Sequence, residues 1–348
     1  MNVFDTTESK ILVTGGAGFI GSALIWDLNQ RGVDDVLVAD FLGTDEKWRN
    51  LAPLRFHDYL EADDLLHRVE ADDPALAEIE LIFHLGACSA TTEHDAAYLV
   101  RNNFEYTKTL ARWALAHDAR FVYASSAATY GDGVHGMSDL ENDISVFRPL
   151  NMYGYSKHLF DLYAAKHGFL DGIVGLKYFN VFGPNEDHKG DMRSLVHKAY
   201  RQIVETGKVQ LFKSHRPDYR DGEQMRDFLY VKDAVNLTIE LAETATAGGL
   251  FNVGSGRAHT WIELATAIFA ALDKEPVIEF IDMPAALRGK YQYHTQADLT
   301  KLRGYCKNVE IMPLDESVAD YVRNYLATDG RLGDETVEGA SLVSAAKV

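Results

Sequence analysis

The part of the sequence that most restricts the fold is the glycine-rich segment Thr14–Leu28, TGGAGFIGSALIWDL. Just before it, KILVT has the apolar residues of a buried strand, and after it apolar residues recur at helical spacing. The glycines, spaced Gly15-x-x-Gly18-x-x-Gly21, therefore lie in a turn between a strand and a helix. A backbone without Cβ atoms at a helix N-terminus can bind a pyrophosphate. The same pattern is also compatible with a turn whose glycines serve only tight packing.

The rest of the first half alternates short β-rich runs with helical patterns, which favours a parallel, doubly wound sheet with its ligand at the carboxyl ends of the strands. We therefore predict an α/β fold of the Rossmann type. The expected strands are Lys10–Thr14, Asp35–Asp40, Leu81–Leu85, Phe121–Ser125 and Gly172–Phe179, and the expected helices are Phe19–Arg31, Ala62–Arg68, Asp95–Ala116 and Tyr153–His167.

After residue 180 the sequence becomes richer in Gly, Pro and charge, which indicates a second, smaller part. We expect residues 1–180 to form a dinucleotide-binding domain, with returns to its sheet near 226–255. Residues 181–225 and 256–327 are expected to form an interleaved α/β substrate domain. Residues 328–348 have few large apolar side chains and are expected to be a weakly ordered tail.

Composition excludes several classes of function. The formal net charge of −18 argues against binding to nucleic acid or to an anionic membrane surface. The 13 histidines show no ligand spacing, so no metal site is expected. Two distant cysteines, Cys88 and Cys306, form no disulfide framework, and no 18-residue apolar run occurs. These features predict a cytoplasmic protein.

Three further features point to a dinucleotide and to proton transfer. Asp40 ends the second predicted strand 19 positions after Gly21, where an acid binds the adenosine ribose. Tyr153 and Lys157 are spaced to share one helix face, and the ammonium is expected to lower the tyrosine pKa from about 10, making it a general base. Ser126 ends the fourth predicted strand and could hold the same substrate oxygen, although strand-end turn chemistry is the simpler alternative.

In this order, these features resemble the extended short-chain dehydrogenase/reductase family, and most closely its ADP-L-glycero-D-manno-heptose 6-epimerases. The resemblance covers most of residues 10–327 and is carried by ILVTGGAGFIGS, FHLGACSATTEHD, YASSAATYG, LNMYGYSKHLFD, KYFNVFGPNEDHKGDM, RDFLYVKD and RGKYQYHTQADLT. It implies an epimerase that oxidises C6″ of an ADP-linked heptose to a ketone and returns the same hydride to the other face. The product would serve the lipopolysaccharide core.

The resemblance also implies residue roles. Tyr153 and Lys189 resemble the two acid/base groups, Lys157 orients the nicotinamide ribose, and Ser126 holds the reacting oxygen. The implied cofactor contacts are Gly15, Gly18, Phe19, Ile20, Gly21, Asp40, Phe41, Lys47, Leu85, Gly86, Ala87, Cys88, Ser89, Asn102, Lys157, Val181 and Lys189. The implied substrate contacts are Ser126, Asn180, Asp191, Lys198, Phe212, Lys213, Ser214, Arg226 and Tyr291. From the residues alone, Lys189 could equally offset the charges of Glu186, Asp187 and Asp191.

The resemblance implies NADP as cofactor, one per subunit and retained through turnover, with NAD as the alternative. An acid such as Asp40 usually favours NAD, whereas these epimerases generally prefer NADP through a following asparagine and nearby lysines. Here Lys47 is present, but Phe41 and Ala62 stand where the asparagine and a second lysine are expected. The resemblance also implies a ring-like homo-oligomer, a pentamer.

Two other functions stay open at this point. A nucleotide-sugar 4,6-dehydratase has the same fold but carries an acidic pair where this chain has Ala127 and Ala128. A non-catalytic NADP-binding sensor would not need the Tyr153–Lys157 pair.

Overall fold

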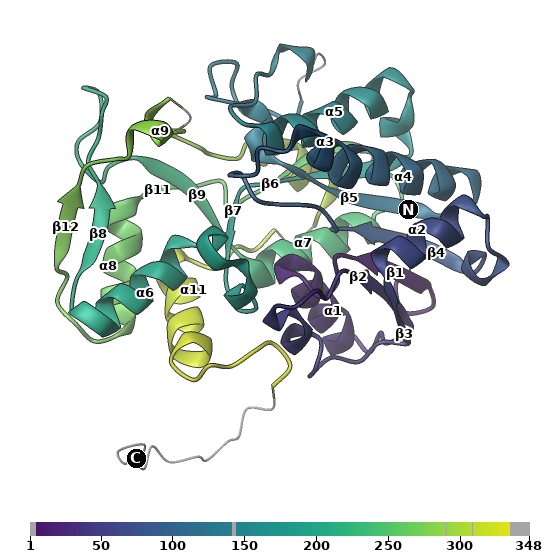
Figure 1. Cartoon of the computed structure of the whole chain (residues 1–348), viewed down its shortest axis with the longest axis horizontal. Helices are drawn as coiled ribbons and strands as arrows, with labels where there is room; N and C mark the ends of the chain where they lie inside the picture. Colours follow the sequence, from purple (N-terminus) through teal and green to yellow (C-terminus); the bar gives the residue numbers. More distant parts are fainter. Residues whose placement is uncertain (1–4, 141–143, 290, 308, 335–348) are drawn as a thin grey trace.

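The computed structural model describes residues 5–140, 144–289, 291–307 and 309–334. Its largest sheet has seven parallel strands in the order β10-β6-β5-β4-β1-β2-β3 (Figure 1). The direction of winding reverses between β1 and β4, and ligands of such sheets bind outside the carboxyl ends of the strands there. The predicted doubly wound α/β fold is confirmed. Its strands are β1 (Lys10–Thr14), β2 (Val36–Asp40), β3 (Asp58–Glu61), β4 (Ile79–His84), β5 (Arg120–Ser126), β6 (Ile173–Tyr178) and β10 (Gly249–Val253).

Each face of this sheet has its own apolar core, because successive side chains of a strand point to opposite faces. On β1, Ile11 and Val13 belong to one core and Leu12 to the other. Helices α1 (Phe19–Gln30) and α7 (Val231–Glu243) cover the first face. The second face is covered by α2 (Ala62–Glu70), α4 (Tyr106–Ala116) and α5 (Met152–Lys166).

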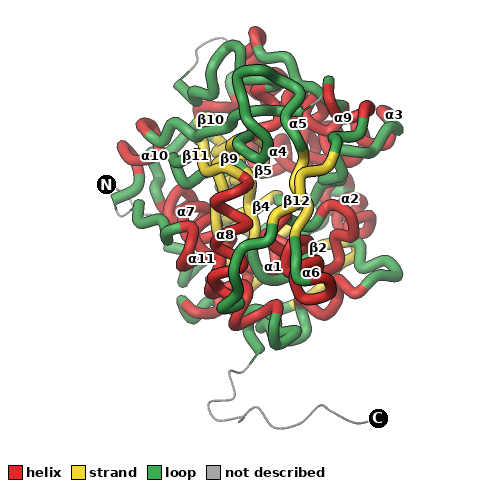
Figure 2. Tube along the Cα trace, turned by 90° about the vertical axis from the view of Figure 1, so that its left-hand side faces the viewer, coloured by secondary structure: helices red, strands yellow, loops and turns green. Residues whose placement is uncertain are grey.

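The remaining strands form two small sheets beside the large one. One has the order β11-β9-β7, and the other pairs β8 with β12 in parallel. Figure 2 looks onto this part of the chain, with β12, α6 and α8 toward the viewer. The strands are β7 (Asn180–Phe182), β8 (Val209–Phe212), β9 (Met225–Tyr230), β11 (Ala258–Thr260) and β12 (Ile278–Ile281). The helices are α6 (Leu195–Thr206), α8 (Trp261–Ala271), α9 (Ala285–Arg288), α10 (Thr300–Tyr305) and α11 (Leu314–Tyr321).

The structure differs from the sequence prediction in one helical region and one strand. The expected helix Asp95–Ala116 consists of α3 (Ala96–Leu99), a π-helical turn and then α4. In the π-helical turn, the Asn103 amide bonds both backbone groups of Cys88, at 2.9 and 3.0 Å. The irregular turn thus fixes the loop that follows β4. β3 was not predicted, because its four residues DYLE carry no strong apolar pattern.

The end of the described chain also differs from the expected tail. Arg331 is 8% exposed and Leu332 is 0% exposed, and Leu332 belongs to the core on the α1 side of the sheet. Residues 335–348 of the expected tail lie outside the described residues. Among the helices that the structure describes, none is both long and apolar enough to cross a bilayer.

Candidate active site

A cavity of about 540 Å³ lies where the carboxyl ends of β1, β2, β4 and β5 meet the loop after β7. Its volume is that of a typical ligand site. The cavity brings together every predicted catalytic and cofactor residue. These are Gly15, Gly18, Phe19, Ile20, Gly21, Asp40, Phe41, Lys47, Leu85, Gly86, Ala87, Cys88, Ser89, Asn102, Ser126, Tyr153, Lys157, Val181 and Lys189.

The glycine turn leaves no room for side chains. Gly15 has φ +69°, and a Cβ atom there would lie 2.6 Å from the backbone nitrogen of Gly86. A Cβ atom on Gly21 would lie 2.1 Å from the Gly15 carbonyl oxygen. The next residues begin α1, whose first turn has no acidic residue and, among the described residues, no side-chain cap. The turn is therefore tightly packed, and the first backbone N–H groups of α1, which have no intrahelical partner, can bind an anion. These residues thus fit the pyrophosphate of a dinucleotide.

The Asp40 carboxylate is already engaged by the protein on both oxygens. Oδ2 accepts from the backbone N–H groups of Ala17 and Gly18, at 2.9 and 3.2 Å. Oδ1 accepts from the backbone N–H of Phe41 at 2.7 Å and from Lys47 Nζ at 3.0 Å. Asp40 therefore ties the glycine turn to the segment that carries Lys47, and the lysine compensates its charge.

Tyr153 lies in the first turn of α5, and capping determines where that helix begins. Asn151 is the N-cap, and its side chain accepts from the backbone N–H of Gly154 at 2.8 Å. A Cβ atom on Gly154 would lie 2.8 Å from the Ala128 carbonyl oxygen, so only glycine lets α5 approach this closely. This approach sets Tyr153 beside Ser126 at the end of β5, and the two hydroxyl groups are hydrogen bonded.

The expected lowering of the Tyr153 pKa is not found in the structure. Burial raises the pKa of the phenol, and the hydrogen bond from Ser126 only partly offsets this rise. Lys157 is 4% exposed, and its ammonium donates to the Ala124 carbonyl at 2.8 Å. Burial lowers the pKa of Lys157 to about 8. Sequence spacing brings the two groups to one cavity but carries no information about burial, which raises the pKa of Tyr153.

Lys189 enters the cavity from the short 3₁₀ segment Asp187–Met192, and its ammonium lies 4.8 Å from the centre of the Phe19 ring. Burial lowers its pKa, although the charge of Glu186 opposes that shift. Two of the three neighbouring acids have other partners. Glu186 accepts from the Ser194 hydroxyl and backbone N–H, and Asp187 pairs with His197 at 3.0 Å. The net shift of the Lys189 pKa is therefore downward, which is the direction that favours proton transfer near neutral pH.

A family model described as "NAD dependent epimerase/dehydratase family" matches residues 11–254, which is more than half of the chain. The chain belongs to this family.

Named relatives within the family are similar over almost their whole length. The chain is 53% identical to an ADP-L-glycero-D-manno-heptose-6-epimerase of Nitratidesulfovibrio vulgaris, covering 91% of this chain and 98% of that one. It is 44% identical to the protein of the same name from Fusobacterium nucleatum, covering 92% and 98%. The crystal structure of the Helicobacter pylori ADP-L-glycero-D-manno-heptose-6-epimerase superposes with a TM-score of 0.76 at 26% identity, covering 93% and 98%. The chain is therefore an epimerase by relationship, and its family supports a nicotinamide cofactor.

Of the predicted substrate residues, only Ser126 lines the cavity of this epimerase. Arg226 is 6% exposed, and its guanidinium lies over the rings of Tyr291 and Trp261, at 4.9 and 5.6 Å. Tyr291 lines a second cavity of about 580 Å³. The remaining predicted substrate residues lie outside both cavities. Lys198 donates to the Asp191 backbone, and Lys213 pairs with Asp282. Asn180, Phe212 and Ser214 lie in or next to β7 and β8.

Sequence reasoning missed several residues that line the first cavity, among them Tyr98, His188 and Met192. Burial and the charge of Lys47 lower the pKa of His188 to about 4, so its ring is neutral at pH 7. Its Nδ1 lies 3.3 Å from the side-chain nitrogen of Asn50. The only available signal was its position directly before Lys189. Among the described residues, no group of three or more His, Cys, Asp or Glu side chains could hold a metal ion.

Proposed function

We propose that the chain inverts C6″ of an ADP-glycero-manno-heptose by transient oxidation, for the heptose of a lipopolysaccharide core. The names of the relatives support the substrate. The structural observation that carries the proposal is that two proton-transfer groups from different elements, Tyr153 of α5 and Lys189 of the loop after β7, line one cavity with the glycine turn.

The chemistry that a bound nicotinamide supplies is reversible hydride transfer at one carbon. Tyr153 takes the proton of the C6″ hydroxyl as the ketone forms, and Ser126 holds the oxygen by a hydrogen bond. Lys157 holds the cofactor ribose and places a positive charge near Tyr153. The glycine turn and α1 bind the pyrophosphate.

Inversion requires that the second proton-transfer group act at a different place. Hydride reaches two opposite faces of one carbon, so the oxygen takes two positions relative to a fixed nicotinamide. One hydroxyl, that of Tyr153, can hardly reach both. Lys189 protonates or deprotonates the oxygen in the other position, and its lowered pKa suits both directions of transfer.

The diphosphate of the substrate requires cationic groups in an acidic protein. Arg226 is a buried guanidinium for which no ion pair is found among the described residues, and Arg216 and Arg288 line the neighbouring cavity with Tyr291. Burial lowers the pKa of Arg226 but leaves it charged at pH 7. We assign this cavity to the ADP part of the substrate.

The function is tested by incubating the protein with ADP-D-glycero-D-manno-heptose and following the sugar by NMR. Inversion at C6″ without loss of water is expected. Loss of water would indicate a 4,6-dehydratase instead. An unchanged sugar, in a sample that retains its cofactor, would contradict the proposal and favour a sensor.

We assign NADP rather than NAD, because Lys47 compensates the Asp40 charge that would otherwise repel a 2′-phosphate. Phe41 and Ala62 supply no charge-assisted hydrogen bond, and each such bond contributes about 1.5–3 kcal/mol. Mass spectrometry of the cofactor released from fresh protein is expected to find NADP. Lys47→Met should reduce the NADP content more than the NAD content. Release of NAD alone would contradict the assignment.

We further propose a cytoplasmic homo-oligomer. Light scattering of the purified protein is expected to give a mass of several subunits, and a monomer would contradict this.

A further inference from the structure

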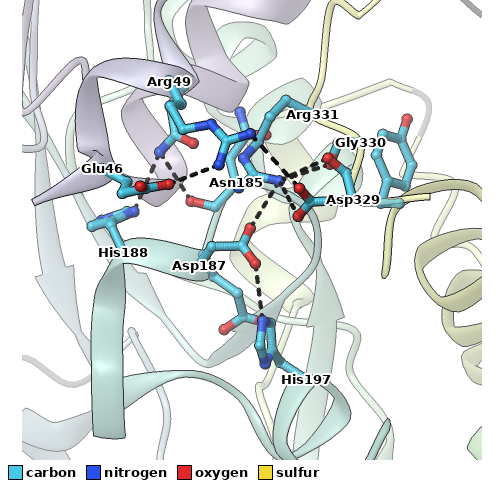
Figure 3. A network of polar contacts seen from close by, with 12 residues as sticks. Glu46, Arg49, Asn185, Asp187, His188, His197, Asp329, Gly330 and Arg331 are labelled. Atoms are coloured by element: carbon cyan, nitrogen blue, oxygen red, sulfur yellow. Dashed lines mark hydrogen bonds and ion pairs between the residues drawn. The ribbon is translucent and has the colours of Figure 1, made fainter. Parts of the chain in front are cut away.

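The last described residues, 328–334, cross the loop that carries Lys189, and we name them the C-terminal strap (Figure 3). The backbone N–H of Leu332 donates to Asn185 Oδ1 at 3.1 Å. The Arg331 guanidinium lies 3.3 Å from Asp187 Oδ2. Arg331 and Leu332 are both buried, so these contacts are not a solvated surface arrangement. The strap therefore binds the loop two and four residues before Lys189.

The residue between these two contacts is held by the preceding helix. Tyr321 of α11 donates to Glu186 Oε1 at 3.0 Å, and Glu186 also accepts from Ser194. Three consecutive loop residues are thus all bound by the C-terminal part of the chain. Asn185 extends the connection to the glycine-turn helix, because its side-chain nitrogen donates to the Ser22 hydroxyl at 3.0 Å.

Asp187 lies between two positive or potentially positive partners. Its Oδ1 accepts from His197 at 3.0 Å, and its Oδ2 faces Arg331. Burial raises the pKa of Asp187, but the His197 hydrogen bond and the Arg331 charge outweigh burial, and the net shift is downward. Asp187 is therefore an anion, and Arg331 is a partner from outside the loop that balances its charge.

The loop forms a short 3₁₀ turn in which the Lys189 backbone N–H donates to the Glu186 carbonyl at 3.0 Å, and non-helical backbone at Gly190 interrupts this turn. Asn185 has φ +74° and Gly190 has φ +53°, both in the left-handed region. After Lys189, the Arg193 backbone N–H donates to the Gly190 carbonyl at 3.3 Å, and the Lys198 ammonium donates to the Asp191 carbonyl. Because the Lys189 backbone bonds directly to Glu186, the contacts that bind residues 185–187 also fix the turn that carries the Lys189 side chain.

We propose that Arg331 is a positioning residue for Lys189 and that the C-terminal strap, through Asp187, holds Lys189 in its proton-transfer position. The inference rests on the proposed function, in which Lys189 serves one of the two oxygen positions. Misplacement of a reacting group by about 1 Å can cost roughly 10²-fold in rate. The loss should affect hydride exchange with one C6″ epimer and not with the other.

The test mixes the holoenzyme with each C6″ epimer separately and records the formation of reduced nicotinamide in a single turnover. Lys189→Met should slow the oxidation of one epimer far more than the oxidation of the other. Arg331→Met should slow the oxidation of that same epimer by roughly 10- to 10²-fold and leave the oxidation rate of the other nearly unchanged. Arg331→Lys should restore most of the rate, because an ammonium can still pair with Asp187.

Arg323→Met is the matched control, because Arg323 also pairs with a carboxylate and a carbonyl, on Asp273 and Ala271. Within the described part of the chain, no hydrogen bond or ion pair joins Arg323 to the loop. It should leave both epimers unaffected. If Arg331→Met does not fold, Asp187→Asn tests the same ion pair and should show the same bias.

The outcomes distinguish the two levels of the proposal. If Lys189→Met slows one epimer more than the other but neither Arg331→Met nor Asp187→Asn does so, the positioning role of Arg331 is wrong. Equal slowing of both epimers by Arg331→Met would indicate a structural role and would also overturn the inference. If Lys189→Met itself shows no bias, the proposed two-group function fails.

Discussion

Tyr153→Phe is expected to reduce kcat by roughly 10²–10⁴-fold, the usual contribution of a positioned acid/base group. The substitution removes only the hydroxyl group, so the cofactor should stay bound at wild-type stoichiometry. Tyr155→Phe is the matched control, because Tyr155 lies on the same helix but is 46% exposed. It should retain wild-type turnover. Near-normal turnover of Tyr153→Phe would remove Tyr153 from the mechanism.

The pKa shifts of Tyr153 and Lys157 also predict how the activity changes with pH. Burial raises the pKa of Tyr153, so the base form grows only as pH rises, and kcat/KM should increase toward alkaline pH. Lys157 has a pKa of about 8, and its charge is lost above that pH, which opposes the increase. Tyr153→Phe should abolish the rising limb of the profile.

The sequence revealed the cofactor half of the site because its signals are local. A glycine turn between a strand and a helix, an acid at the end of a strand and a tyrosine four residues before a lysine are each fixed by one or two elements. The parallel sheet then brings together the carboxyl ends of its strands, and with them these residues. The structure accordingly places the residues Gly21, Asp40 and Tyr153 around one cavity.

The rest of the site depends on long-range packing that no local pattern encodes. Leu332 and Asn185 are separated by 147 positions, and the polar sequence around Leu332 resembles a free tail. The pKa of Tyr153 is raised by burial, which the spacing of Tyr153 and Lys157 does not reveal. The position of Arg226 over two aromatic rings likewise depends on how a loop folds back onto β9.

The second large effect is expected on stability, when Lys177 beneath the active site is replaced. Its ammonium is buried, with 1% exposure, and donates to Asp161 Oδ2 and to the Thr129 hydroxyl, each at 2.7 Å. Asp161 is 0% exposed and also accepts from the hydroxyl groups of Tyr123 and Ser125, at 2.9 and 2.8 Å. The pair joins β6 to α5 one helical turn after Lys157, so it supports the helix that carries the catalytic residues.

Lys177→Met should lower the free energy of unfolding by about 3–5 kcal/mol, because it leaves the Asp161 carboxylate buried without a counter-charge. Chemical denaturation of the holoenzyme measures this. Lys208→Met is the matched control, since Lys208 pairs with Glu279 at 2.5 Å but both side chains are at least 40% exposed, and it should have a far smaller effect. Adding Asp161→Asn to Lys177→Met should recover much of the loss, because the neutral amide can still accept from Tyr123. If the double variant is no more stable than Lys177→Met alone, the loss comes from packing and not from the unpaired charge.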